Sequence, residues 1–284
     1  MASINDYPAI IVQEIAKRLD YRSIQAMKLC NRHIYNALTD SLLWIELCER
    51  DKRALPSIEF RKSLAESADN NEACVGQLDF ERIWVKNPFR SNLAPPMLES
   101  LADMQTQYGW TFNRSEDAEM MVVEEPPAGT EPHPEVTRCI ATSCWEGKRI
   151  VKIDLVKEGI PEWILDHIRP RIIVGEMVAP RWDCGSTYTM RTKLLRPDEE
   201  FGRIYEDDRI MNTTKAWNQW TSPCRWEKVE MTFEDYPMGI RHIEVHSCGE
   251  DRQNWAGNYG AKFANLEIRI EMPDKVYWIT GDDE

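Results

Sequence analysis

Apolar positions along the chain change their spacing near residue 108. Before it, Ile11, Ile15 and Leu19 recur every four residues, which is typical of one face of a helix. A second helical run is predicted over 23–38, and a third begins near Asp40, a good N-cap. Residues 8–50 are therefore predicted to form three short helices, whose core is thin enough to need another surface to pack against.

Two further helices are predicted at 60–68 and 80–85, and Pro88 and the pair Pro95-Pro96 interrupt the pattern after them. From about residue 108 the spacing becomes alternating. Val229, Met231 and Phe233 alternate with polar residues, and the same holds over 188–194, 243–246 and 266–272. Loops rich in Pro, Gly, Asp and Asn separate these runs, so we predict an antiparallel β-sandwich.

Composition excludes several classes of function. The net charge of −13 disfavours nucleic acid and anionic membranes as partners, because both require a basic face. The start of the chain lacks the pattern of a signal peptide, and no stretch of about 18 apolar residues occurs. The eight cysteines form no C-x-x-C pair and no zinc-like spacing, which predicts reduced thiols without a metal or another cofactor. We therefore expect a cytoplasmic or nuclear protein.

The N-terminal residues resemble an F-box, a short helical motif. The resemblance rests on Tyr7-Pro8, Ile15, Leu19-Asp20, Ile24, Leu29-Cys30-Asn31-Arg32 and Leu43-Trp44. It implies that the motif docks on a Skp adaptor, which binds a cullin and, through it, a RING subunit. The residues expected to form the adaptor face, or the core behind it, are Pro8, Ile11, Ile15, Leu19, Ile24, Leu29 and Leu43.

The rest of the chain resembles the F-box-associated domain of the sugar-recognising F-box subfamily. The matching segments, in this order, are Asn87-Pro88-Phe89, Ile153-Asp154-Leu155, Arg181 to Tyr188, Trp226 to Val229, Phe233 to Arg241 and Asn254 to Phe263. The resemblance implies an α+β multidomain protein with an F-box at 4–50, a helical linker at 51–86 and a jelly-roll-like sandwich of about ten strands at 87–274. It also implies a substrate receptor of a ubiquitin ligase, with no catalysis of its own.

The resemblance further implies a binding site on loops at one end of the sandwich. Some members bind the inner sugars of high-mannose N-glycans on misfolded glycoproteins, through an Asp and a Tyr-Trp-Lys run. The Asp falls on Asp183 and the Trp on Trp255, whereas Asn254 and Ala256 replace the Tyr and the Lys. A pyranose needs an aromatic face for its C–H surface and polar partners for its hydroxyls.

Several readings of this site stay open on sequence grounds. Asp183 either contacts sugar or bonds its own loop backbone, as Asp often does in turns. A Phe of the family falls on Cys144, and the neighbouring Trp145 supplies a ring only if the strand register shifts by one residue. Each lost contact is worth about 1 kcal/mol, so the pocket either keeps a weakened glycan site or takes a protein ligand.

Two rival functions remain beside the ligase receptor. A lectin-like binding protein outside any ligase would have a similar sequence, and it would not copurify with a Skp adaptor. A sandwich glycosidase would need two carboxylates in one cleft, and Asp183 has no evident partner in the sequence.

Overall fold

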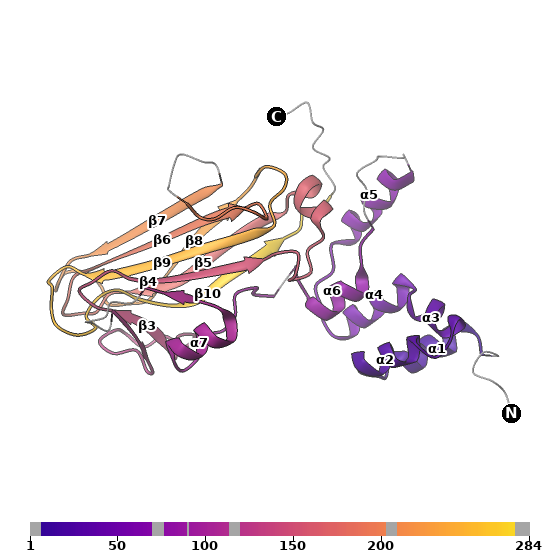
Figure 1. Ribbon diagram of the computed structural model, residues 1–284, viewed down its shortest axis with the longest axis horizontal. Coiled ribbons are helices and arrows are strands. Elements are labelled where there is room, and N and C mark those ends of the chain that lie inside the picture. The colour runs from indigo at the N-terminus through magenta and orange to yellow at the C-terminus, as the bar shows by residue number, and fades with distance from the viewer. Residues whose placement is uncertain (1–6, 70–76, 90, 114–119, 203–208, 276–284) are drawn as a thin grey trace. The chain divides into compact units, whose positions relative to one another are not determined.

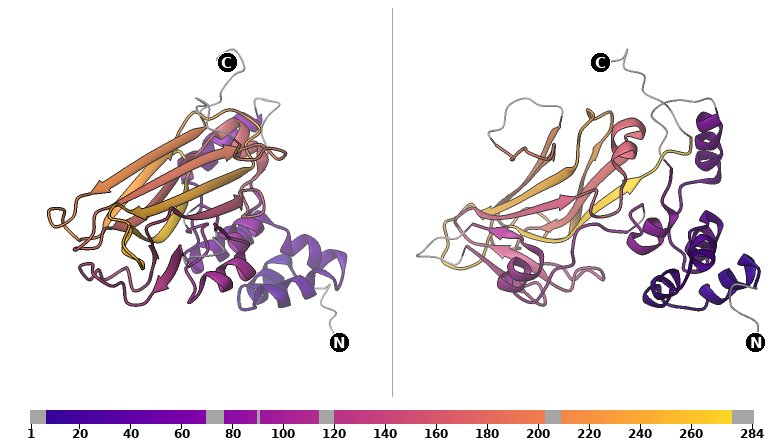
Figure 2. Two further views of the ribbon diagram at one scale, coloured as in Figure 1. Left: turned by 60° about the vertical axis from the view of Figure 1, so that its left-hand side comes forward. Right: turned by 45° about the vertical axis from the view of Figure 1, so that its right-hand side comes forward.

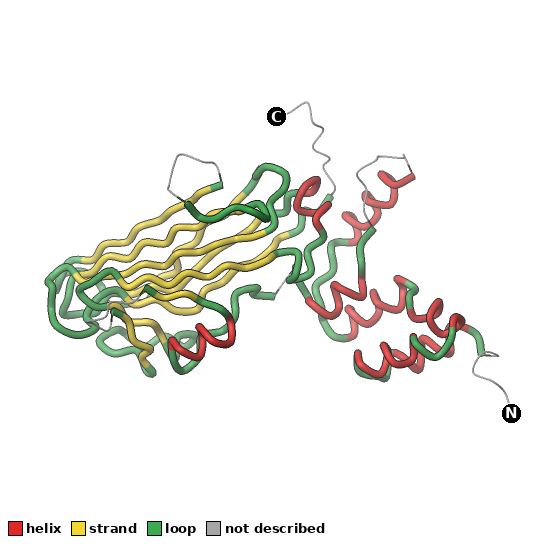
Figure 3. The backbone as a smooth tube through the Cα atoms, in the orientation of Figure 1, coloured by secondary structure: helices red, strands yellow, loops and turns green. Residues whose placement is uncertain are grey.

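The structure is a computed structural model that describes residues 7–69, 77–89, 91–113, 120–202 and 209–275. The chain divides into two compact units. The first is Met1–Ser91 with Pro273–Val276, and the second is Asn92–Met272 with Tyr277–Glu284. Helices make up the regular structure of the first unit, and strands dominate the second (Figure 3). The predicted boundaries at 4–50, 51–86 and 87–274 stay predictions, and residues 4–6 lie outside the described residues.

The first unit contains six helices in its described part. They are α1 (Ala9–Ala16), α2 (Tyr21–Lys28), α3 (Arg32–Leu38), α4 (Ser41–Arg50), α5 (Ile58–Asp69) and α6 (Phe80–Lys86). Asp20, Asn31, Asp40 and Asp79 are the N-caps of α2, α3, α4 and α6, and each side chain accepts a hydrogen bond from a backbone N–H of the first turn.

The expected helical run over 23–38 is divided into two helices. Asn31 is extended (φ −167°) and its side chain accepts from the N–H of Ile34, so a new helix begins there. The region 8–50 therefore holds four short helices rather than three. An Asn between two apolar turns favours capping over helix continuation because its side chain competes for backbone donors.

Trp44 of α4 lies at the centre of the helical core. Its indole N–H donates to the carbonyl of Leu38 at 2.8 Å, and its ring packs against Trp84 of α6 with centroids 5.5 Å apart. Val12 and Ala16 form the buried face of α1. The i, i+4 set of Ile11 and Ile15 points the other way and is exposed.

The second unit is a two-layered antiparallel sandwich (Figures 1 and 2). Its elements are α7 (Leu101–Tyr108), β1 (Thr111–Phe112), β2 (Met121–Glu124), β3 (Cys139–Thr142), β4 (Gly147–Asp154), the π-helical η2 (Ile164–Ile168), β5 (Arg171–Ala179), β6 (Ser186–Leu195), β7 (Ile210–Trp217), β8 (Glu227–Phe233), β9 (His242–Asp251) and β10 (Lys262–Glu271). The predicted fold class, helices followed by a ten-stranded sandwich, is confirmed.

The strand order is that of a jelly roll with two added strands. One sheet runs β1-β4-β9-β6-β7 and the other β2-β3-β10-β5-β8. With β1 and β2 set aside, the first, eighth, third and sixth of the remaining strands share one sheet, and the second, seventh, fourth and fifth share the other. This interleaving defines the jelly roll. Its consequence here is that β3–β4, β5–β6, β7–β8 and β9–β10 are each joined across the two sheets.

A buried polar network ties the two sheets together. Arg149 of β4 donates through Nη2 to Glu176 of β5 at 2.6 Å and to Ser247 of β9 at 2.7 Å. Glu176 also accepts from the hydroxyls of Tyr188 and Ser247. Burial raises the pKa of Tyr188 well above 10, and the nearby charge of Glu176 adds to the effect, so this hydroxyl remains a donor.

One strand departs from the predicted alternation. Along β9 the side chains of Glu244 and His246 are buried, although the pattern predicted a solvated face. Phe201 covers them, with its ring stacked on His246 at a centroid distance of 3.8 Å, and His246 contacts Glu244 at 2.7 Å. A polar residue on a central strand thus becomes buried when a distant segment folds over it.

No helix in the described parts of the chain is long and apolar enough to cross a membrane.

Candidate substrate-binding surface

Four loops meet at one end of the sandwich. They are residues 143–146, 180–185, 218–226 and 252–261, and we call them the tip loops. The strand registers place them together, because Ser186 lies opposite both Trp217 and Asp251, and Lys262 lies opposite both Ala141 and Ala179. Hydrogen bonds also join the loops, such as those from Asp251 N–H to Ser143 and from Arg252 N–H to Gly185. The tip is therefore one continuous structure built from distant parts of the sequence.

The tip carries exposed tryptophans. Among the described residues, the tryptophans with large exposed fractions are Trp145, Trp182, Trp220 and Trp255, at 36% to 61%, and each belongs to a different tip loop. An exposed Trp offers a broad apolar face with one N–H donor at little conformational cost. Four of them at one end of the sandwich form an exposed aromatic surface.

Asp183 is held in an ion pair. Its carboxylate accepts from Arg181 Nε at 2.7 Å and from Nη2 at 3.3 Å. The Arg181 guanidinium lies over the ring of Tyr259 at 4.5 Å, and Tyr259 meets Trp255 edge to face at 5.4 Å. The structure thus brings Asp183 and Trp255 into one chain of contacts, through two residues that the sequence analysis did not select.

Asn254 and Ala256 flank Trp255 in the exposed part of its loop. Asn254 adopts a left-handed conformation (φ 56°), which Asn tolerates better than most residues. Its N–H donates to Asp251 Oδ1 at 2.6 Å, and Gln253 N–H donates to the same oxygen at 2.9 Å. Asp251 therefore fixes the turn that presents Trp255.

Cys144 and Trp145 lie in the turn between β3 and β4. Cys144 is half-buried, whereas Trp145 is exposed. The backbone of this turn is joined to the base of the 252–261 loop through Ser143, whose carbonyl accepts from Asp251 at 2.9 Å. Cys144 occupies the position of the family's Phe but has no ring. The neighbouring Trp145 has an exposed ring.

Trp182 and Trp220 form a second aromatic pair that the sequence analysis missed. Their rings meet edge to face at 5.1 Å. Trp220 has φ of 64°, which is rare for a bulky residue and costs about 1–2 kcal/mol. Gln219 compensates in part by donating to the Asp183 carbonyl at 2.9 Å. The sequence did hold a signal for this pair, because a Trp in a turn-rich loop has few buried positions to occupy and is therefore expected at the surface.

Cys184 underlies the tip without reactive character. Its thiol contacts the Gln253 side-chain oxygen at 2.9 Å, and burial raises its pKa to about 11. A protonated, buried thiol is a poor nucleophile.

The predicted adaptor residues lie in the helical unit and fall into two groups. Ile24 and Leu43 are buried in the helical core, and Leu19 is half-buried. Pro8, Ile11, Ile15 and Leu29 are exposed. Leu29 follows the end of α2 and is 88% exposed.

The chain combines a helical unit with exposed apolar residues and a jelly roll with an aromatic tip, an architecture suited to a receptor. The model of the family described as "F-box associated region" matches residues 84–270. "F-box only protein 6" of Mus musculus is 30% identical over 273 residues, covering 95% of this chain and 84% of the relative. The Homo sapiens protein of the same name is 29% identical, with 94% and 84% covered.

"F-box only protein 44" of Mus musculus is 33% identical over 142 residues, which are 50% of this chain and 53% of that protein. The chain belongs to the F-box-associated family of F-box only proteins. Membership supports, in general terms, a substrate-recognition role in an SCF-type ubiquitin ligase and binding of the Skp adaptor.

Proposed function

We propose that this chain is the substrate receptor of an SCF-type ligase and that it captures target proteins through the tip loops. The exposed tryptophans gathered at the tip carry the proposal. The chain would act by proximity, because holding a target near a charged conjugating enzyme raises its effective concentration. Its place of action would be the cytoplasm or the nucleus.

Adaptor binding is assigned to the exposed apolar residues of α1 and α2. Ile11 and Ile15 lie one turn apart on α1, and both are exposed beside a core that is already complete with Val12 and Ala16. Apolar groups left in water on a small helical unit favour a partner that covers them.

The double substitution Ile11→Asp with Ile15→Asp is expected to weaken adaptor binding by about 100-fold or more, because it buries two charges in an apolar contact. The measurement is co-expression of the full chain with Skp adaptor followed by size-exclusion chromatography. Ile58→Asp is the matched control, since Ile58 is a similarly exposed isoleucine of the same unit. A complex retained by the double variant would place the adaptor contact elsewhere in the chain, whereas an unmodified chain that forms no complex with the adaptor would favour a binding protein outside any ligase.

The target class we infer is N-glycosylated protein, with a sugar seated near Trp255 and Asp183. The Trp255–Tyr259 pair supplies an aromatic face, and the Asp183–Arg181 pair supplies acceptors and donors beside it. Asn254 lacks the stacking ring of a Tyr, and Ala256 lacks the charged donor of a Lys. We therefore expect affinity about 10- to 100-fold below that of a site with both.

A second candidate is a protein segment bound on the Trp182–Trp220 pair. The specific observation is the strained backbone of Trp220, held in place by contacts with neighbouring loops. Strain of this kind persists where the surrounding structure enforces it, and it clusters at binding sites.

The two target classes separate in a calorimetric titration of the full chain with chitobiose. If glycan is the ligand, Trp255→Ala weakens binding by about tenfold or more, whereas Trp220→Ala changes it little. Thermal unfolding of both variants checks that the fold is intact. The absence of heat at millimolar sugar would reject the glycan assignment and leave the protein ligand, without affecting the adaptor result.

A further inference from the structure

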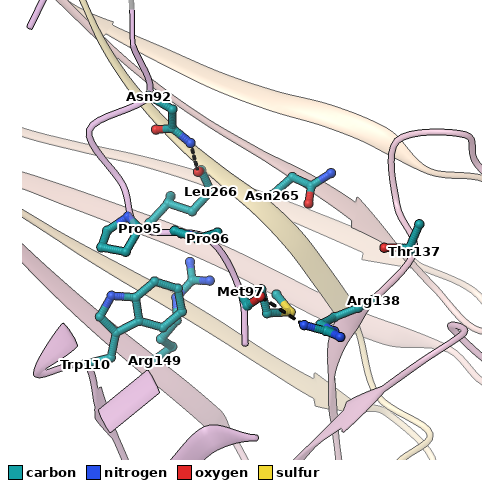
Figure 4. Close-up of a pocket in the computed structure, with 10 residues that line it drawn as sticks. All are labelled: Asn92, Pro95, Pro96, Met97, Trp110, Thr137, Arg138, Arg149, Asn265 and Leu266. Atoms are coloured by element: carbon teal, nitrogen blue, oxygen red, sulfur yellow. Dashed lines mark hydrogen bonds between the residues drawn. The ribbon is translucent and has the colours of Figure 1, made fainter. Parts of the chain in front are cut away.

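A pocket of about 390 Å³ opens into the sandwich unit away from the tip loops. Its walls come from Asn92, Pro95 to Met97, Trp110, Thr137-Arg138, Arg149 and Asn265-Leu266 (Figure 4). None of these residues belongs to a tip loop or to helices α1 and α2. The volume lies within the usual range for small-molecule sites.

The wall formed by Asn92 to Met97 is firmly attached to β10. Asn92 donates to the Leu266 carbonyl at 2.8 Å, and its side-chain oxygen accepts from the N–H groups of Ala94 and Ile268, both at 2.9 Å. Pro95 and Pro96 follow, and they add conformational stiffness. The pocket is therefore a preformed feature of the fold.

Two side chains at the pocket hold unpaired donors. Arg149 is fully buried, and its Nε and Nη1 have no hydrogen-bond partner among the described residues. Trp110 is 3% exposed, and its Nε1 likewise has none there. The guanidinium carbon of Arg149 lies 5.1 Å from the centroid of the Trp110 ring, and Figure 4 shows the two side chains together. Buried donors of this kind each cost about 1–3 kcal/mol unless an acceptor arrives.

The charges at the pocket complement an acceptor. Its described lining contains two guanidinium groups, those of Arg138 and Arg149, and no carboxylate. Glu125 and Glu176 pair with these two groups but do not line the pocket. Met97, Leu266 and the two prolines supply apolar walls beside the donors. In a chain of net charge −13, a pocket whose charged lining groups are both cationic points to an oxygen-bearing anion.

We propose that this pocket binds a small carboxylate with an apolar body. The carboxylate accepts from Trp110 Nε1 and from the free donors of Arg149, and the apolar body lies against Pro95, Pro96 and Met97. A carboxylate suits the site better than a neutral carbonyl, because hydrogen bonds to a charged acceptor are about twice as strong. The described lining includes no residue of a tip loop, so the bound carboxylate would not be part of the contact proposed for target capture.

The test is a titration of the ¹⁵N-labelled full chain with phenylacetate and with its neutral isostere phenylacetamide. The readouts are the indole N–H signal of Trp110, identified by its loss in Trp110→Phe, and the Nε–H signal of Arg149. Phenylacetate is expected to shift both signals saturably and to bind at least about tenfold more tightly than the amide.

Trp110→Phe keeps an aromatic ring, though a smaller one, and removes the N–H donor, so it should weaken phenylacetate binding by about five- to tenfold. Trp217→Phe is the matched control, because Trp217 is a buried indole donor that does not line the pocket. Arg138→Gln should also weaken phenylacetate binding. Because Arg138 is partly exposed, this substitution is less apt to disturb folding and so gives an independent test of the site. The proposal would be overturned if phenylacetate and phenylacetamide bound equally well. It would also be overturned if neither signal shifted saturably, which would mean that only water fills the site.

Discussion

The interior of the sandwich and its tip each contain an arginine–carboxylate pair stacked on an aromatic ring. In the interior, Arg149 pairs with Glu176 and lies 5.1 Å from the Phe263 ring. At the tip, Arg181 pairs with Asp183 and lies 4.5 Å from the Tyr259 ring. The side-chain exposures are 0% and 0% in the first pair and 21% and 13% in the second.

This difference in burial separates two uses of the same chemistry. A buried pair cannot lose one partner without leaving a charge in a low-dielectric interior, so it acts as a fixed tie between sheets. A pair that is only partly buried can release one partner toward water at a lower cost than a fully buried pair. The tip pair is therefore better suited to exchanging a partner for a ligand, and the interior pair is suited to holding the fold while Arg149 keeps two donors that are unpaired within the described part of the chain.

The largest expected effect comes from the interior pair. Glu176→Gln removes the charge that balances Arg149 and is expected to lower the free energy of unfolding by about 3–5 kcal/mol. Urea denaturation of the full chain measures it. Asp183→Asn at the tip is the matched control, with a smaller expected loss of about 1–2 kcal/mol because the pair is only partly buried. A tip variant as destabilised as the interior one would contradict the distinction drawn between the two pairs.

An intermediate effect is expected at a third pair, Arg241 with Asp166 of η2, whose side chains are 14% and 15% exposed. Burial alone would raise the pKa of Asp166. Hydrogen bonds from Arg241 and from the Gly239 N–H outweigh this, so that the pKa falls below its ordinary value of 3.8.

A carboxylate whose pKa is lower in the folded state stabilises the fold above its unfolded pKa, and this contribution is lost as the pH falls through the folded pKa. Asp166→Asn is expected to cost about 1–3 kcal/mol at pH 7, with the difference from the unmodified chain shrinking below about pH 4. Urea midpoints measured at several pH values test this. A difference that stays constant down to pH 2.5 would show that the carboxylate charge is not the cause.

The sequence pattern predicted strands best where local alternation matched the environment. Val229, Met231 and Phe233 of β8 are buried as expected, because β8 is an edge strand with one covered face. Glu244 and His246 of β9 were expected on the solvated face, and the prediction was wrong because Phe201 from another segment stacks on His246, which in turn contacts Glu244. Helix α7 and η2 were not predicted, since short helices between strands leave little periodic signal.

The candidate site could be located from the sequence but not assembled. Asp183 and Trp255 were selected from a family motif, and the structure links them through Arg181 and Tyr259. Those contacts join the 180–185 and 252–261 loops, which come together only when the strands pair. Trp220 had no motif to mark it, and its partner Trp182 was quoted only as part of one. Their roles as ligand contacts remain predictions.

The crossing connections of the jelly roll have a consequence for how such receptors diversify. Each tip loop leaves one sheet and enters the other, so none of them sets the register between neighbouring strands. A loop can therefore be lengthened, shortened or given new side chains while every hydrogen-bonded ladder stays as it is. If the tip loops bind targets as proposed, new targets become accessible by editing four short segments, and the unit that carries them remains unaltered.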